Sequence, residues 1–252
     1  MTHSGFSRRD FIRVSVIAGG GLLVACGGGS SGGRPTTPPS NNNGTPTPTP
    51  AEEFILGEFM RIGTDNRITV LVGATEIGQG ALTAIPMIVA EELDADWSLV
   101  SAEQSPVAAN FNNPYFQNLL QFTVASSAIR GYFDAQRSVG AAIRQMLINA
   151  AAKLWGVNAS SLRTEASYVI DDIGGRSASY GELSSAAANE SVPSNPPLKD
   201  PASYRIIGTS PQRTDASAKT DGSFKYGMDV DIPGMLTALI ARPPRFNGQA
   251  LS

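Results

Sequence analysis

Apolar residues in the first part of the chain form two short runs around a turn. Residues 67–73 are rich in β-branched side chains, with Ile68, Val70 and Val72 at every second position, and the turn-like sequence 63–66 separates this run from residues 56–62. A period of two indicates a strand with one buried face, and two such runs around a short turn predict a β-hairpin. This hairpin leads into the glycine-containing loop 73–80.

Two longer stretches repeat their apolar residues at intervals of three and four, which is the spacing of one face of an α-helix. The first follows Gly80 and continues to Leu93, and Pro86 is tolerated because it lies near the helix start. The second, residues 126–155, is the longest helical pattern. Its second face carries three arginines that we interpret as a solvated basic face, or alternatively as contacts to phosphates or to a partner protein: Arg130, Arg137 and Arg144.

The later sequence predicts mainly short strands. A strand is expected at 163–170, another near 178–180, and a short helix from Glu182, before a proline-rich boundary at 191–200. The elements up to residue 202 predict an α+β fold with helices packed on a mixed sheet.

A second β pattern follows the proline-rich boundary. Residues 224–232 alternate strictly between apolar side chains and Lys, Gly or Asp, which predicts a half-buried strand. Pro233-Gly234 suits the central pair of a type II turn, and residues 235–241 supply a returning strand. Because the edges of these strands need a neighbour, we expect this segment to be poorly stable alone.

Composition narrows the chemistry that the chain can perform. The 252 residues carry 19 Lys and Arg against 22 Asp and Glu, a net charge of −3, and no long basic run that would match nucleic acid. Cys26 is the single cysteine and His3 the single histidine. A disulfide, a cysteine-ligated iron–sulfur cluster and histidine-based catalysis are therefore excluded within the chain. We assign no catalytic residue and no metal ligand.

The N-terminal residues indicate export and anchoring. Arg8 and Arg9, an apolar stretch, and Leu-Val-Ala before Cys26 resemble a twin-arginine signal with a lipobox over residues 1–26. The apolar stretch of about eleven residues is too short to span a bilayer. Residues 27–53, rich first in Gly and Ser and then in Pro and Thr, are expected to be a flexible linker. We therefore expect a periplasmic protein that a lipid on Cys26 attaches to a membrane.

The loop before the first predicted helix is the strongest candidate for a binding site. It holds Glu76, Gly78, Gln79 and Gly80. Glycines let a backbone approach a ligand closely, and a helix N-terminus offers unpaired N–H groups and the positive end of a dipole. The loop therefore suits a phosphate or a cofactor, although a plain strand-to-helix turn is the alternative.

Three blocks of sequence point to one family. The first is E-I-G-Q-G at 76–80 with Thr83 and A-E-E-L-D-A-D-W at 90–97, the second lies at 136–144, and the third runs over 207–244. Together they resemble the large, molybdopterin-binding subunit of the xanthine dehydrogenase and aldehyde oxidase superfamily, in its exported, isoquinoline 1-oxidoreductase-like form.

This resemblance implies an enzyme subunit. It implies hydroxylation of an N-heteroaromatic ring or an aldehyde, with water as the oxygen source, by molybdenum on a molybdopterin of the cytosine dinucleotide form. Electrons would pass to a small [2Fe-2S] partner subunit. Residues 54–202 would be the molybdopterin-binding-type domain, and 203–252 the start of an a/b hammerhead-like domain. The implied cofactor contacts are Glu76, Gly78, Gln79, Gly80 and Thr83.

Two departures from the family pattern limit this reading. Where the family carries a T-G-G-S turn, the chain has Thr123-Val124-Ala125-Ser126, whose central side chains would obstruct close approach of a ligand. No position matches the family's distal catalytic glutamate, so we expect the N-terminal portion of such a subunit, inactive alone. The alternative is a non-catalytic, tethered lipoprotein that binds a phosphorylated ligand or a partner.

Overall fold

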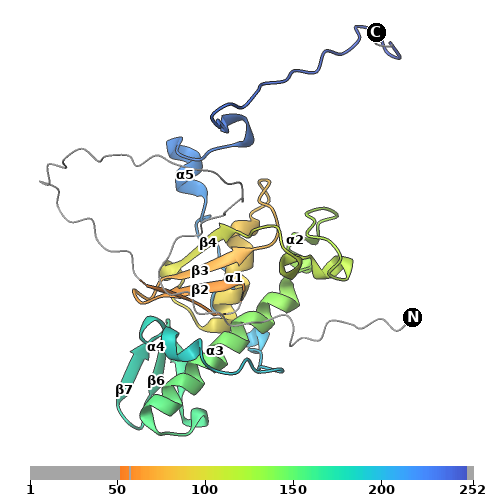
Figure 1. Cartoon of the computed structure of the whole chain (residues 1–252). Helices are drawn as coiled ribbons and strands as arrows, with labels where there is room; N and C mark the ends of the chain where they lie inside the picture. The colour runs from red at the N-terminus through yellow and green to blue at the C-terminus, as the bar shows by residue number, and fades with distance from the viewer. Residues whose placement is uncertain (1–51, 57, 249–252) are drawn as a thin grey trace, which may run out of the picture. The chain divides into compact units, whose positions relative to one another are not determined.

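The computed structural model of the chain describes residues 52–56 and 58–248 (Figure 1). The predicted export signal at Arg8 and Arg9 and the predicted lipid site at Cys26 lie outside the described residues. Among the helices of the described ranges, none combines the length and the apolar character that crossing a bilayer requires.

Two compact units make up the described chain, the first ending at Thr214 and the second beginning at Asp215. The first unit is built on a sheet of order β1-β2-β3-β4, in which β1 to β3 are antiparallel and β4 pairs with β3 in parallel. Its strands are β1 (Glu53–Ile55), β2 (Met60–Gly63), β3 (Ile68–Val72) and β4 (Val100–Gln104). The predicted hairpin and the predicted mixed sheet are therefore confirmed, whereas the domain ranges stay predictions.

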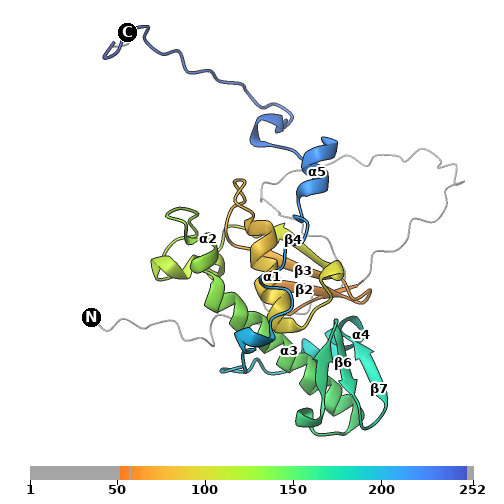
Figure 2. The same ribbon diagram turned by 180° about the vertical axis from the view of Figure 1, so that it is seen from behind.

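Helices cover one face of this sheet, as the view from behind shows (Figure 2). Helix α1 connects the parallel strands β3 and β4, and α3 packs along α1. The predicted helix 126–155 is formed in two pieces, which a turn at Gly131 and Tyr132 separates. The bounds are α1 (Ala81–Leu93), α2 (Ser127–Arg130) and α3 (Phe133–Trp155).

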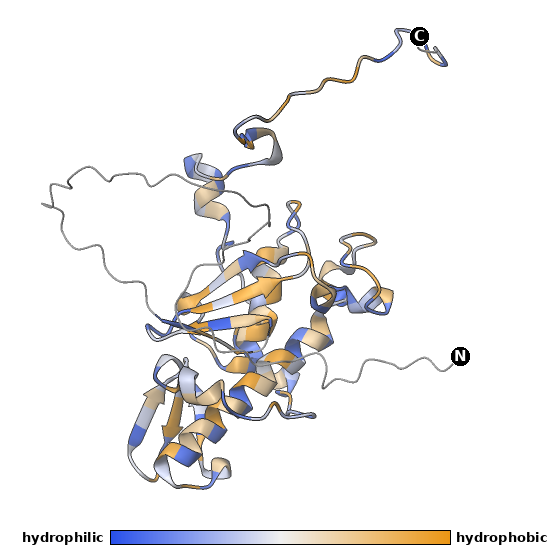
Figure 3. Ribbon diagram, viewed as in Figure 1, coloured by the Kyte–Doolittle hydropathy of each residue, from blue (hydrophilic) through white to orange (hydrophobic). Residues whose placement is uncertain are grey.

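The apolar core lies between the sheet and these helices. Figure 3 shows the hydrophobic colour concentrated on the strands of the sheet and on α1. Large side chains that are fully buried come from β2, β3, α1 and α3: Met60, Ile62, Ile68, Ile85, Leu93, Ile143, Met146 and Leu147. Since Val72 and Ala81, at the two ends of the loop 73–80, are also fully buried in this core, both ends of the loop are held in place.

A second, antiparallel sheet and a helix complete the first unit. The single strand predicted at 163–170 is wrong, because the chain turns at Ala166 and Ser167, both with positive φ, and forms a hairpin. Helix α4 begins with a capping box between Ser179 and Glu182. The bounds are β5 (Arg163–Glu165), β6 (Tyr168–Asp171), β7 (Arg176–Ser179) and α4 (Tyr180–Ala187).

Short 3-10 helices fill the connections of the first unit, and the second unit holds one α-helix and one 3-10 turn among its described residues. In the first unit these are η1 (Trp97–Leu99), η2 (Ala109–Phe111), η3 (Pro114–Phe116), η4 (Ala159–Ser161) and η5 (Pro201–Ser203). In the second they are α5 (Ala216–Asp221) and η6 (Gly227–Asp229).

The strands predicted at 224–232 and 235–241 are wrong. The predicted turn is present, because the Met235 N–H donates to the Ile232 carbonyl over 2.8 Å and Gly234 has a φ of 82°. A type II turn does not match the twist of two paired strands and splays them apart. No strand pairs with this segment among the described residues, and its apolar side chains are exposed.

We predict that Gly140→Val destabilises the first unit. A Cβ atom at this position would lie 2.5 Å from the Val89 carbonyl oxygen, so α1 and α3 would have to separate. Overpacking of this kind costs about 3 kcal/mol, which urea unfolding would measure. The control is Lys153→Val on the same helix, whose side chain is 72% exposed and whose replacement should cost less than about 1 kcal/mol. Equal losses in the two variants would contradict the close contact.

Candidate functional site

The loop 73–80 leaves the carboxyl end of β3 and enters α1. In sheets with parallel strands joined by a helix, ligands bind beyond the carboxyl ends of the strands. Gly78 and Gly80 have φ values of 105° and 89°, which favour glycine. A Cβ atom on Gly78 would meet nothing within 4 Å, and one on Gly80 would meet only an Arg213 nitrogen at 3.8 Å. The glycines therefore border open space.

The Glu76 carboxylate fills the N-terminus of α1. Its Oε1 atom accepts the backbone N–H groups of Gly78 at 2.8 Å and Gly80 at 3.0 Å, and its Oε2 atom accepts that of Leu82 at 3.0 Å. The side chain is 5% exposed. A negative charge at this position is favourable because it meets orphan donors and the positive end of the helix dipole. The expectation that these N–H groups are free for an external phosphate is therefore wrong.

Glu76 is held in its ionised form. Burial by itself raises the pKa of this carboxyl group, but the N–H groups of Gly80, Leu82 and Gly78 and the positive charge of Arg213 outweigh burial and hold the pKa below its usual 4.5. The Arg213 Nη2 atom lies 3.2 Å from Oε1 of the carboxylate. The loop thus contains its own anion, and Arg213 supplies the balancing cation from a distant part of the chain.

The Gln79 side chain makes two hydrogen bonds within the loop and can still make further hydrogen bonds to a ligand. Its Oε1 atom accepts the Ile77 N–H at 2.7 Å, and its Nε2 atom donates to the Thr75 carbonyl at 2.8 Å. A primary amide has a second N–H and a second lone pair, and Gln79 is exposed. Together with the open space beside the glycines, this arrangement fits the polar edge of a cofactor better than it fits a bare phosphate.

Thr83 lies one turn into α1 and does not border the open space. It is 7% exposed, and its Oγ1 atom accepts the Thr214 N–H at 3.1 Å. The structure therefore brings Glu76, Gly78, Gln79 and Gly80 together on one loop. Thr83 instead contacts Thr214, at the end of a segment, residues 199–214, that runs along α1.

A second loop lies directly against the first. The Thr75 N–H donates to Thr123 Oγ1 over 2.8 Å. Ala125 and Ser126 both have left-handed backbones, with φ of 55° and 52°, a conformation that is costly for residues with a side chain. The two loops and the residues that precede the second one carry exposed apolar side chains: Ile77, Tyr115, Leu119, Leu120, Phe122 and Val124. The departure from the T-G-G-S turn was the one sequence signal that pointed to this second loop.

Glu91, in the last turn of α1, has a structural role that the sequence pattern did not reveal. Glu91 is completely buried. Its Oε2 atom accepts the N–H groups of Arg205, Ile206 and Ile207 at 2.9, 2.6 and 3.0 Å, and its Oε1 atom accepts from Lys199 Nζ at 2.6 Å. Four donors thus converge on one carboxylate and fix the segment that contains them to α1.

The prediction of a solvated face of arginines is wrong for the two members that lie on α3. Arg137 Nε lies 2.7 Å from a Glu92 oxygen, and Arg144 donates to the Pro197 carbonyl at 2.7 Å. Their side chains are only 12% and 11% exposed. Arg130, the last residue of α2, is exposed and stacks over the Tyr115 ring at 4.2 Å. All three arginines therefore contact other groups of the protein.

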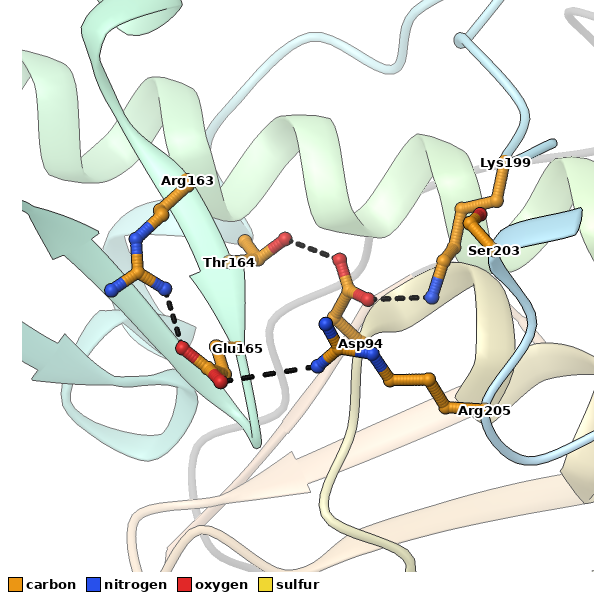
Figure 4. Close-up of a pocket in the computed structure, with 7 residues that line it drawn as sticks. All are labelled: Asp94, Arg163, Thr164, Glu165, Lys199, Ser203 and Arg205. Atoms are coloured by element: carbon orange, nitrogen blue, oxygen red, sulfur yellow. Dashed lines mark hydrogen bonds and ion pairs between the residues drawn. The ribbon is translucent and has the colours of Figure 1, made fainter.

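One polar cavity of about 280 Å³ lies at the far end of α1 from the loop (Figure 4). Asp94, the C-cap of α1, accepts from Thr164 Oγ1 at 2.6 Å and from Lys199 Nζ at 2.7 Å. The cavity is lined by Asp94, Arg163, Thr164, Glu165, Lys199, Ser203 and Arg205. Its charged groups pair with one another, and no residue predicted to bind the cofactor lines it. We therefore assign these residues a structural role, in which they connect the end of α1 to β5 and to residues 199–205.

Within residues 52–56 and 58–248, no group of three His, Cys, Asp or Glu side chains is placed to hold a metal ion. The amide and backbone groups that the loop offers can donate and accept hydrogen bonds to an organic ligand.

Comparison with known proteins identifies relatives of this chain. The family of molybdopterin cofactor-binding domains matches residues 12–231. The chain is 36% identical over 220 residues to the beta subunit of isoquinoline 1-oxidoreductase from Brevundimonas diminuta, covering 74% of this chain and 28% of that protein. It is 30% identical over 189 residues to a membrane-bound aldehyde dehydrogenase (pyrroloquinoline-quinone) of Gluconacetobacter polyoxogenes, covering 73% and 23%.

A third relative is one of the subunits of nicotinate dehydrogenase from Pseudomonas putida, which is 29% identical over 199 residues, covering 79% of this chain and 16% of that protein. The chain thus spans about a quarter or less of the length of these relatives. The matched region contains the glycine loop, α1 and residues 199–214, which run along α1.

We predict that Glu91→Gln lowers the free energy of unfolding by about 3–5 kcal/mol, because it removes the charge from a buried, paired carboxylate. Burial alone raises the pKa of Glu91, but Lys199 and three backbone N–H groups hold the pKa below 4.5. A depressed pKa contributes stability above pH 4.5 that is lost as pH falls through the folded-state value. The difference between wild type and variant should therefore shrink below about pH 4.5.

Urea unfolding at pH 7 and at pH 3.5 measures this difference. The matched control is Glu165→Gln, whose side chain is 47% exposed and should contribute less than about 1 kcal/mol. A Glu91→Gln loss as small as that of the control, or one that does not change with pH, would contradict the role assigned to Glu91.

Proposed function

The chain belongs to the family of molybdopterin cofactor-binding domains, and from this premise we propose that it forms the N-terminal part of the large subunit of a molybdenum hydroxylase. The observation that carries the proposal is the family match over residues 12–231, which includes the loop at Gly78 and Gly80. The geometry of that loop is compatible, because open space and an exposed amide lie beside a backbone that glycine alone favours.

The loop would hold one edge of the cofactor. The backbone at Gly78 and Gly80 would lie against it, and the Gln79 amide would donate and accept hydrogen bonds. Glu76 would act indirectly, because its carboxylate shapes the loop and is 5% exposed. When bound, the cofactor supplies the redox chemistry, and the protein supplies binding and orientation.

Substrate, cofactor form and partner are parts of the same proposal. The names of the relatives indicate N-heteroaromatic compounds or aldehydes as substrates, and we propose the same classes here, with water as the oxygen source. We also propose the cytosine dinucleotide form of molybdopterin and a small [2Fe-2S] partner subunit, in line with two relatives that are named as subunits. The alternative of a non-catalytic lipoprotein has no support from the comparisons.

We propose export to the periplasm by the twin-arginine route, followed by attachment of a lipid to Cys26. The support is the pattern of Arg8, Arg9, an apolar stretch and Cys26. In a bacterial host, replacing both arginines by lysine should keep the protein in the cytoplasm, and Cys26→Ser should release it from the membrane fraction. Fractionation and immunoblotting measure both outcomes, and an unchanged distribution of the two variants would contradict the proposal.

We predict that Gln79→Ala weakens retention of molybdopterin in the longest natural form of the polypeptide. The loss of one or two hydrogen bonds, each worth about 1 kcal/mol, should lower cofactor affinity by roughly five- to thirty-fold. Elemental analysis for molybdenum and fluorescence of the oxidised pterin measure the content after dialysis.

The matched control is Gln212→Ala, which removes an exposed amide outside the loop and should leave the cofactor content unchanged. Pyrroloquinoline quinone should be assayed in the same samples, because one relative carries that cofactor in its name. A wild-type protein that contains the quinone and no molybdenum would overturn the proposed function.

A further inference from the structure

Residues 199–214, which we call the strap, run along α1 from its last turn to the glycine loop. At the first end, Glu91 accepts Lys199 and the N–H groups of Arg205, Ile206 and Ile207. At the other end, Arg213 and Thr214 contact the loop and the first turn of α1. The strap thus connects the two ends of one helix.

A proline in α1 explains how the strap attaches at its second end. Pro86 lies inside the helix and has no N–H, so the carbonyl of Leu82, four residues earlier, lacks its helical donor. Thr214 Oγ1 donates to that carbonyl at 2.8 Å, and the Thr214 N–H donates to Thr83 Oγ1 at 3.1 Å. Thr214 therefore satisfies the acceptor that Pro86 leaves open and places its neighbour Arg213 over the loop.

Arg213 holds two groups of the loop at once. Its Nη1 atom donates to the Gly78 carbonyl at 3.0 Å, and its Nη2 atom lies 3.2 Å from the Glu76 carboxylate. The two nitrogens of the guanidinium group thus connect the Glu76 carboxylate to the peptide group between Gly78 and Gln79. That peptide bond is trans.

The orientation of this peptide determines where the Gln79 N–H points. In a planar trans peptide the C=O and N–H vectors point in opposite directions. With the Gly78 carbonyl directed at Arg213, the Gln79 N–H is directed away from it, and no acceptor within the described residues receives this N–H. Glycine at position 78 tolerates several backbone conformations, so residue 78 by itself does not prevent the peptide from flipping.

We infer that Arg213 is a positioning residue, which keeps the Gly78–Gln79 peptide in one orientation so that the Gln79 N–H remains available as a donor to the ligand. The ligand atom it meets is a hydrogen-bond acceptor, such as a ring nitrogen or carbonyl oxygen of a pterin. This identification of the ligand rests on the proposed function, whereas the role of Arg213 in the loop does not. The strap thereby makes the shape of the binding loop depend on sequence that is more than a hundred residues away.

The test measures amide hydrogen exchange in the isotope-labelled chain without any cofactor. Arg213→Ala should speed exchange of the Gly78, Gly80 and Leu82 N–H groups by about ten-fold or more, because the carboxylate that receives them loses its charged partner. Amides in the middle of α3 should keep their wild-type rates. Arg213→Lys should restore part of the protection, since it keeps the charge but not the fork.

The matched control is Arg205→Ala on the same strap. Its side chain is 77% exposed and lies 3.9 Å from Glu165, while its backbone N–H, which the substitution keeps, binds Glu91. Loop exchange should therefore match the wild type. The inference is overturned if Arg213→Ala changes loop exchange less than about two-fold, or if it speeds α3 and the loop equally, since the residue would then only stabilise the fold. Neither result depends on whether molybdopterin binds.

Discussion

A buried glutamate at each end of α1 determines how the rest of the first unit is arranged. Glu76 accepts three backbone N–H groups before and within the first turn, and Glu91 accepts three more from the strap. A buried carboxylate is tolerated only where donors and a cation satisfy it. Arg213 and Lys199 supply those cations. The loop, the helix and the strap are therefore one connected hydrogen-bonded assembly.

This assembly changes the kind of binding site that the loop can be. A helix N-terminus usually attracts a phosphate through its free N–H groups, but here the Glu76 carboxylate already occupies the donors of Gly80 and Leu82. A second anion beside Glu76 would meet like charge. What remains open is the outer side of the loop, with the Gln79 amide and exposed glycine backbone. A polar, largely uncharged edge of a cofactor matches that surface better than its phosphate does.

Local patterns predicted those parts of the fold that depend on local interactions. The hairpin of β2 and β3, α1, and a short helix near Glu182 were predicted from local periodicity and turn residues. The strap was missed because its order comes from Glu91, more than a hundred residues away. The strand at 224–232 was predicted wrongly because alternation reports a side-chain pattern, whereas a strand also requires a hydrogen-bonded neighbour, and the type II turn does not provide one.

In the candidate site, too, the sequence predicted the local features and did not predict those that depend on distant residues. Residues 76–80 were found from glycine spacing and family resemblance, because the φ values of Gly78 and Gly80 restrict those positions to few residue types. The contacts of Arg213 and of Thr123 with residues 75–80 were not predicted, since nothing in their own sequence requires them to meet that loop. A short motif therefore identifies the loop, but two distant segments, the loop at Thr123 and the strap, help to determine its shape. A substitution in the strap that removes a contact to the loop, such as Arg213→Ala, should consequently affect ligand binding through the loop's geometry, even though Arg213 touches no ligand.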